Sequence, residues 1–236
     1  MFNRRQMIQQ SAFMAAAMTT PGLFAEELMK TARQTEGPFY PNKLPLDTDN
    51  DLLIINDQLT PAVGTIVHLT GRVRNLSGEP IRNAIVEIWQ TDNNGVYIHT
   101  EARDKDKQDT NFQGFGRFLT NRKGEYYFRT LKPVHYGPRT SHIHLAVKQG
   151  SKRLLTTQIY TKGDPKNARD RILQSIEDVK SRNLLIVDYK PLPHTKTGEL
   201  AAHFDVIVGV TPEDRDDDEG RILPSQRTNR RPRQGS

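Results

Sequence analysis

Cysteine is absent from all 236 residues of this chain. The protein therefore forms no disulfides, holds no iron–sulfur cluster on thiolates and has no cysteine nucleophile. Lipid anchors that are attached to a cysteine are excluded for the same reason. If the protein is exported, it also has no thiol that could mispair in an oxidising compartment.

Long apolar runs are missing as well. No stretch after the N-terminus is long and apolar enough to span a bilayer, so we expect no membrane anchor. The N-terminus differs, because Arg4 and Arg5 precede a mildly apolar run, Met7–Met18, and a small residue, Ala25, follows further on. This order is typical of a twin-arginine export signal. We interpret residues 1–25 as that signal and expect an exported, periplasmic protein; the alternative is a frayed N-terminus of a cytoplasmic protein.

A basic stripe is the third missing feature. The formal net charge is +6, but two of the arginines lie in the first 25 residues, and the charges between Glu213 and Arg233 cancel. Nucleic-acid binding needs a localised basic surface, so we expect no nucleic-acid partner. Residues 211–236 are charged and polar with almost no apolar side chains, which predicts a disordered tail.

Short segments of strand character fill residues 26–210, which we expect to form one domain. Turn-forming residues separate these segments, which are 64–74, 84–90, 116–120, 125–130, 142–149, 153–161, 184–188 and 203–210. The turns Asn121–Gly124 and Gly150-Ser151 predict hairpins between their flanking strands. Many short strands joined by turns favour an all-β fold, and we expect an antiparallel β-sandwich.

One short helix is expected beside the strands. Asp164-Pro165 suits an N-cap followed by proline at the first helical position. An apolar face at helical spacing follows, made of Ala168, Ile172, Leu173, Ile176 and Val179. The pattern predicts a single helix that begins at Pro165.

The most informative stretch is His142-Ile143-His144. Residues two apart in a strand share one face, so both histidines can reach one metal ion while Ile143 packs into the core. Upstream, Asn94-Gly95-Val96-Tyr97 sets a tyrosine on a tight turn after a buried strand, and Tyr136 precedes the histidines. Two imidazoles and two phenol oxygens suit ferric iron better than zinc, whose usual donors are thiolates, imidazoles and carboxylates.

These motifs resemble the intradiol ring-cleavage dioxygenases, and most closely the protocatechuate 3,4-dioxygenase type of catalytic domain. The resemblance runs over roughly residues 33 to 210. It is carried by ordered segments of the sequence, namely Thr35–Pro41, Ala84–Gln90, Asp92–Tyr97, Asp109–Arg117, Gly124–Arg129, Lys132-Pro133 and Arg139–His144.

The resemblance implies Fe(III) as the cofactor, with Tyr97, Tyr136, His142 and His144 as its ligands. Tyr136 corresponds to the axial tyrosinate that leaves the iron and accepts a substrate proton, and His144 to the opposing axial ligand. Tyr97 and His142 correspond to the equatorial pair, with a hydroxide completing the sphere.

The implied activity is that of a non-haem dioxygenase, whose partners are a catechol-type small molecule and O2. The ring would open between the two hydroxyl-bearing carbons to give a cis,cis-muconate-type diacid. Arg139 corresponds to an arginine that stabilises negative charge on the bound ring. Gln158 corresponds to a glutamine that orients the ring.

One departure from the family concerns the segment between Tyr136 and His142. Residues 137–141 are fewer than in the well-studied enzymes, and the tryptophan that often follows the tyrosine is missing. We expect a more open mouth that admits larger or more varied catechols.

Two other classes compete with the dioxygenase. A non-catalytic prealbumin-like binding sandwich shares the strand and turn motifs but has no cause to keep the tyrosines in register with His-x-His. A zinc hydrolase needs a carboxylate base near the histidines, and the sequence places none there. Among the remaining histidines, we expect His68 and His203 to be structural, His99 to line the pocket and His135 to lie at the surface. The physiological catechol, a homo-oligomeric state and the role of the tail stay open.

Overall fold

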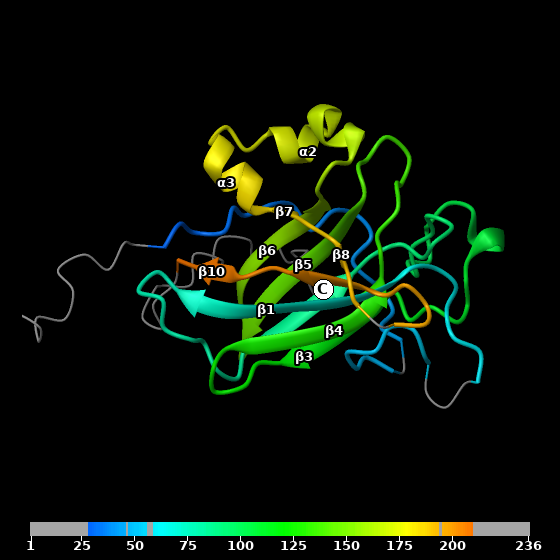
Figure 1. Ribbon diagram of the computed structural model, residues 1–236, viewed down its shortest axis with the longest axis horizontal. Coiled ribbons are helices and arrows are strands. Elements are labelled where there is room, and N and C mark those ends of the chain that lie inside the picture. The colour runs from blue at the N-terminus through cyan, green and yellow to red at the C-terminus, as the bar shows by residue number, and fades with distance from the viewer. Residues whose placement is uncertain (1–27, 46, 56–58, 194, 210–236) are drawn as a thin grey trace, which may run out of the picture.

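The computed structural model describes residues 28–45, 47–55, 59–193 and 195–209. They form two five-stranded sheets packed face to face around an apolar core (Figure 1). The interpretations of residues 1–25 as an export signal and of 211–236 as a tail lie outside the described residues. No helix in the described ranges is long and apolar enough to cross a membrane.

The first sheet is built around its longest strand, β1 (Ile66–Asn75). It pairs in antiparallel fashion with β4 (Glu125–Leu131) and in parallel fashion with β9 (Leu200–His203) and β10 (Val206–Val208). A two-residue strand, β8 (Lys190–Pro191), extends the sheet beyond β9. Alternate residues of β1 point into the core, including Val67, Leu69 and Val73, as the period-two pattern predicts.

The second sheet has the order β3 (Phe115–Leu119), β2 (Ile85–Trp89), β5 (His142–Gln149), β6 (Lys152–Thr161) and β7 (Ile186–Val187). All neighbours are antiparallel except β6 and β7. Residues 142–147 of β5 are buried on both faces of the strand, unlike those of β1. The sheet therefore has a second buried surface, opposite the sandwich core.

The predicted all-β sandwich is confirmed, with two differences in connection. The sheets are mixed rather than purely antiparallel, because short C-terminal strands join the edges in parallel. The hairpin predicted at Asn121–Gly124 is wrong, since β3 belongs to the second sheet and β4 to the first. The turn instead carries the chain from one sheet to the other. The hairpin at Gly150-Ser151 is confirmed by the pairing of β5 with β6.

The single helix predicted from Pro165 is also wrong in its continuity. Three short pieces replace it, η2 (Pro165–Arg169), α2 (Arg171–Gln174) and α3 (Val179–Leu184), and one further 3₁₀ turn, η1 (Lys105–Lys107), lies elsewhere. Asp170 and Asp178 have extended backbone angles, and each caps the helix that follows it. An Asp in that role starts a new helix instead of continuing the old one. The N-cap predicted at Asp164 is confirmed, since its side chain accepts from Lys166 N.

Candidate active site

Three polar side chains meet on the second buried surface of the β2–β5–β6 sheet. His142 and His144 point to it from β5, and Tyr97 reaches it from the loop after β2. The two Nε2 atoms are 3.2 Å apart, and Tyr97 Oη lies 3.2 Å from each of them. All three side chains are almost fully buried. The strand register produces this grouping, because Ile143 between the histidines points into the sandwich core.

A tight turn presents Tyr97 to the histidines. The buried carboxylate of Asp92 accepts the backbone N–H groups of Asn94 and Val96, both at 2.9 Å. Gly95 between them has φ +79°, a conformation that glycine adopts without strain. The sequence signal Asn-Gly-Val-Tyr thus reflects a turn that is folded around one aspartate.

The hydrogen bond of His142 fixes its tautomer. Nδ1 lies 2.7 Å from the carbonyl oxygen of Thr140, which can only accept. Nδ1 therefore carries the proton, and the lone pair of Nε2 faces the cluster. His144 stacks flat on Trp89, with ring centroids 4.8 Å apart and an interplanar angle of 8°. Its Nδ1 is buried and has no hydrogen-bond partner among the described residues.

Without a bound metal ion, burial keeps the side chains of Tyr97, His142 and His144 uncharged. It lowers the pKa of His142 to about 4, and the positive charge of Arg139 acts in the same direction. Burial, then His142 and Arg139, hold the pKa of His144 well below its usual range. Burial also raises the pKa of Tyr97 far above 10, which the charge of Arg139 offsets in part. A bound cation reverses the balance at Tyr97, because it stabilises the phenolate beside it.

The donor set fits a metal ion. Two ligands at right angles, each about 2.1 Å from one ion, are about 3 Å apart, close to the separations in this cluster. Neutral imidazoles with free lone pairs are the form that binds metals. Within the described ranges, no group of three or more His, Asp or Glu side chains could hold a metal, so this site depends on tyrosine oxygen.

Tyr136 lies at the rim of the cluster. Its ring meets that of Tyr97 edge-on, with centroids 5.3 Å apart, and the side chain is only half-buried. Phe39 packs against both rings, stacked on Tyr97 at 5.0 Å and edge-on to Tyr136 at 5.3 Å. All four residues predicted as ligands are therefore in one place, with Tyr136 as the most accessible.

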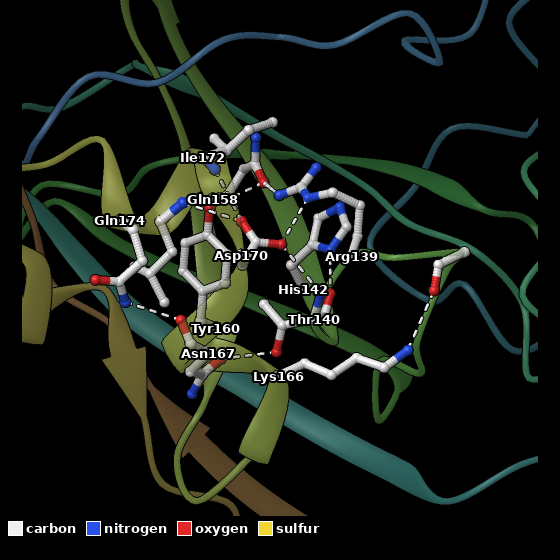
Figure 2. Close-up of polar contacts among 12 residues, drawn as sticks. Arg139, Thr140, His142, Gln158, Tyr160, Lys166, Asn167, Asp170, Ile172 and Gln174 are labelled. Carbon is white, nitrogen blue, oxygen red and sulfur yellow. Dashed lines mark hydrogen bonds and ion pairs between the residues drawn. The ribbon is translucent and has the colours of Figure 1, made fainter.

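Arg139 and Gln158, the two further residues singled out by the resemblance, lie on the same side as His142 (Figure 2). Arg139 Nη2 donates to Gln158 Oε1 at 2.6 Å. Gln158 pairs across the sheet with His144, which places its side chain on the same surface. The Tyr160 hydroxyl donates to the same amide oxygen at 3.1 Å, so the predicted pair belongs to a larger network.

An N-terminal arm, residues 31–41, covers the surface of the β2–β5–β6 sheet that carries the histidines. The sequence did not predict this role. The Gln158 amide donates to the Thr35 carbonyl, and the one hydroxyl proton of Tyr160 is shared between Gln158 Oε1 and Gln34 Oε1, each 3.1 Å from its oxygen. Tyr40 packs edge-on to Trp89 and donates to the fully buried Glu87 at 3.0 Å. The aromatic pair after Gly37-Pro38 was the available signal, but nothing local indicated which surface it would cover.

Four further histidines lie within the described residues, and three of them have partners away from the cluster. His68 is bonded to Tyr127 and Glu199 on the first sheet, and His203 pairs with Asp205. His135 points to Asp164 and is exposed, as expected for a surface residue. His99 is buried edge-on to Phe39, with ring centroids 5.7 Å apart, which puts it next to the cluster.

Comparison with known families matches residues 35–209 to the Dioxygenase family. The protocatechuate 3,4-dioxygenase beta chain of Burkholderia cepacia is 35% identical over 167 residues, which cover 65% of this chain and 69% of that relative. Catechol 1,2-dioxygenase 1 of Acinetobacter lwoffii is 31% identical over 153 residues, or 57% of this chain. The chain spans about half of that second relative, 47% of its length.

Solved structures share the fold. The dioxygenase domain of a dioxygenase carbohydrate-binding protein fusion from Streptomyces sp. SirexAA-E superposes with a TM-score of 0.59 at 24% identity, covering 78% of this chain and 100% of that chain. The intradiol ring-cleavage dioxygenase from Tetranychus urticae superposes with a TM-score of 0.61 at 20% identity, covering 80% and 98%.

Asp164, beside the segment that leads into His142, predicts a pH dependence of stability. Burial alone would raise the pKa of Asp164, but hydrogen bonds from Ser141, Lys166 N and His135 outweigh it and hold that pKa far below 3.8. The folded carboxylate therefore contributes stability above about pH 4, which is lost as the pH falls and the unfolded chain takes up the proton. We expect Asp164→Asn to be less stable than wild type at pH 6, with a difference that shrinks towards pH 3.

Urea unfolding of both proteins between pH 3 and pH 6 measures this difference. Asp188→Asn is the control, since the carboxylate of Asp188 is half-exposed and pairs with the exposed Lys162 within the described part of the chain. A difference for Asp164→Asn that stayed constant across the range would contradict the assignment.

Proposed function

The chain belongs to the intradiol ring-cleavage dioxygenase family, and from that premise we propose that its site uses O2 to cleave catechols between the two hydroxyl-bearing carbons. The product would be a cis,cis-muconate-type diacid that contains both oxygen atoms. The observation that carries the proposal is the convergence of Tyr97, His142 and His144 within 3.2 Å of one another. A binding sandwich without a metal has no use for three buried donors at that spacing.

The resident metal in this proposal is ferric iron, held by Tyr97, Tyr136, His142 and His144. When bound, it would supply a Lewis-acidic centre that makes a catechol ring reactive towards O2. The donor chemistry supports this choice, since phenolate oxygen favours a hard, highly charged ion and imidazole nitrogen also binds iron.

Three residues of the chain carry the remaining steps. Tyr136 is half-buried at the rim, where its oxygen can accept a proton from an incoming substrate hydroxyl. Arg139 brings a fixed positive charge beside the cluster, which stabilises negative charge on the bound ring. Gln158 positions that guanidinium and offers an amide to the ring. Phe39 and the arm exclude water from the side of Tyr97.

The substrate range follows from the short segment between Tyr136 and His142. Arg139 N donates to the Tyr136 carbonyl at 2.9 Å, so the chain turns back at once, and Gly137 and Pro138 are exposed. Because residues 137–141 form such a short segment, we expect the entrance to the site to be open and to accept unsubstituted and varied catechols. We assign no second arginine to grip a substrate carboxylate.

The metal assignment is tested by substitution of its donors. Iron-loaded wild type should be red-brown, because tyrosinate bound to ferric iron absorbs visible light. Tyr97→Phe and His142→Ala each delete a donor and should lose most of the iron, measured by elemental analysis and visible absorption. His203→Ala, an exposed residue on the other sheet, should keep both. Colourless protein that contains stoichiometric zinc and no iron would refute the donor set.

Arg139→Ala tests the electrostatic role. The variant should bind iron and still change colour with catechol, but turn over about 100- to 1000-fold more slowly, the usual effect of losing one preorganised charge donor. Steady-state rates with catechol, protocatechuate and hydroxyquinol give this number and the substrate range together. Arg182→Ala, on α3, is the matched control. Turnover at the wild-type rate would remove Arg139 from the mechanism, and activity with protocatechuate alone would refute the open mouth.

Export to the periplasm is part of the proposal, supported by Arg4-Arg5 and the apolar run behind them. A twin-arginine route carries folded proteins, which suits a site that acquires its metal before export. Replacing both arginines by lysine should leave the precursor in the cytoplasm, as measured by cell fractionation. Unchanged periplasmic recovery would rule out this route.

A further inference from the structure

The three residues that lead into His142 are clamped from one side. Their partners are Asp164, Asn167 and Asp170, spaced three apart across η2. Asn167 lies within η2, whereas Asp164 and Asp170 are its N-cap and C-cap and have extended backbone angles. Hydrogen bonds to residues 139–141 show that all three side chains face the same segment. We call these three side chains the η2 ridge. Its sequence signal is Asp-x-x-Asn-x-x-Asp. This spacing of three residues differs from the 3.6-residue period that indicates an α-helix, so the helical pattern does not reveal it.

Each side chain of the η2 ridge holds a different part of the segment. Asp164 Oδ2 accepts the hydroxyl of Ser141 at 2.6 Å, and Asn167 Oδ1 accepts the hydroxyl of Thr140 at 2.7 Å. Asp170 Oδ2 accepts both Thr140 N at 3.0 Å and Arg139 Nε at 2.7 Å. Figure 2 shows Asp170 between α2 and the guanidinium.

The two oxygens of Asp170 do different work. Oδ1 caps α2 by accepting Ile172 N at 3.1 Å and Leu173 N at 3.0 Å. Oδ2 is left for Arg139 and Thr140. The carboxylate is fully buried, yet its hydrogen bonds outweigh burial and lower its pKa, so it stays charged. The charge that faces Arg139 is thus maintained by four N–H donors.

Arg139 is held at two points of its fork. Asp170 takes Nε and Gln158 takes Nη2, and two hydrogen bonds to one planar group fix its plane as well as its position. A flexible arginine side chain is thereby turned into a fixed charge next to the histidines.

His142 is reached through Thr140. The N–H of Thr140 is held by Asp170, and its carbonyl accepts the Nδ1 proton of His142 at 2.7 Å. This carbonyl selects the tautomer whose Nε2 lone pair faces Tyr97 and His144. The buried carboxylate of Asp170 therefore orients the guanidinium of Arg139 directly and the imidazole of His142 through Thr140.

We propose that Asp170 is a positioning residue of this site, which orients Arg139 directly and His142 through Thr140. The effect on turnover rests on the proposed dioxygenase function, whereas the effect on the His142 tautomer does not.

Asp170→Asn separates this role from helix capping. Asparagine caps helices as well as aspartate does, so Oδ1 can still serve α2. At the other position an amide NH2 replaces Oδ2 and faces two N–H donors. We expect a folded, iron-binding protein whose kcat falls about 10- to 100-fold, the usual effect of losing an outer-shell partner, with a much smaller change in KM.

Asp178→Asn is the matched control. Asp178 caps α3 by accepting Ser181 N at 2.8 Å and makes the same kind of turn at its helix start. The hydrogen bonds of its carboxylate stay within residues 178–181, away from Arg139 and Thr140. Wild-type kcat is expected for this variant. An equal loss in both variants would show a general effect of helix capping and would overturn the proposal.

A double-mutant cycle tests whether Asp170 acts through Arg139. In an Arg139→Ala background, Asp170→Asn should cost far less in kcat than it does alone, because the group that it positions is gone. A full additional loss would mean that Asp170 acts on turnover by another route and would count against the proposal.

Nitrogen-15 NMR of the histidine rings in the metal-free protein gives a readout that needs no activity. The wild type should show His142 protonated at Nδ1, and Asp170→Asn should shift the signals towards the Nε2–H tautomer. Unchanged ring signals together with wild-type kcat would overturn the proposal. If the wild type cleaves no catechol, the proposed function fails, and the NMR comparison still decides the role of Asp170.

Arg139→Lys keeps the inference testable if Asp170→Asn does not fold. Lysine retains the charge but lacks the planar fork, and the α2 cap is untouched. We expect a loss of kcat similar to that of Asp170→Asn. Turnover at the wild-type rate would show that charge alone suffices and would overturn the need for positioning.

Discussion

The site depends on one constraint, which is that β5 is buried on both faces. Alternation along the strand sends Ile143 into the sandwich core and His142 and His144 to the opposite side. In an ordinary β-sandwich the outer face of a sheet is exposed to solvent, and two imidazoles there would keep their usual pKa values and mobility. Here the N-terminal arm and the 92–97 turn cover it. The resulting desolvation keeps the imidazoles neutral and makes every nearby charge count for more.

One charged side chain, Arg139, acts on all three buried donors. Arg139 opposes protonation of both histidines and favours the phenolate of Tyr97. Its own partner, Asp170, accepts Arg139 Nε and is itself held by backbone N–H groups. The guanidinium is therefore balanced without a carboxylate entering the donor set. The Arg139–Asp170 ion pair fixes the position of the guanidinium, whereas its net contribution to the stability of the fold is small, because desolvation of the two charges offsets their attraction.

The sequence predicted those features that are local or follow a strand period. The His-x-His pair, the Tyr97 turn and the N-cap at Asp164 fall in this class. The failures share a cause, which is that local patterns do not say which sheet a strand joins. The 121–124 turn looks like a hairpin turn, yet it connects two sheets. The helix was read as continuous because its apolar period ran through Asp170, whose capping role became visible only with its partners. Arg139 and Gln158 came from resemblance, and their mutual contact needed the structure.

The arm has a further consequence, for the order in which the molecule is completed. Thr31 N donates to the Ile207 carbonyl in β10, and Gln34 bonds to Gln158, 124 residues further along the chain. Contacts this distant in sequence close large loops and so tend to form late in folding. During synthesis the arm emerges before β6 and β10, so it has no surface to dock on until those strands exist. The surface that carries His142 and His144 is therefore covered late in folding, and its donors stay accessible to solvent until the arm docks on β6 and β10.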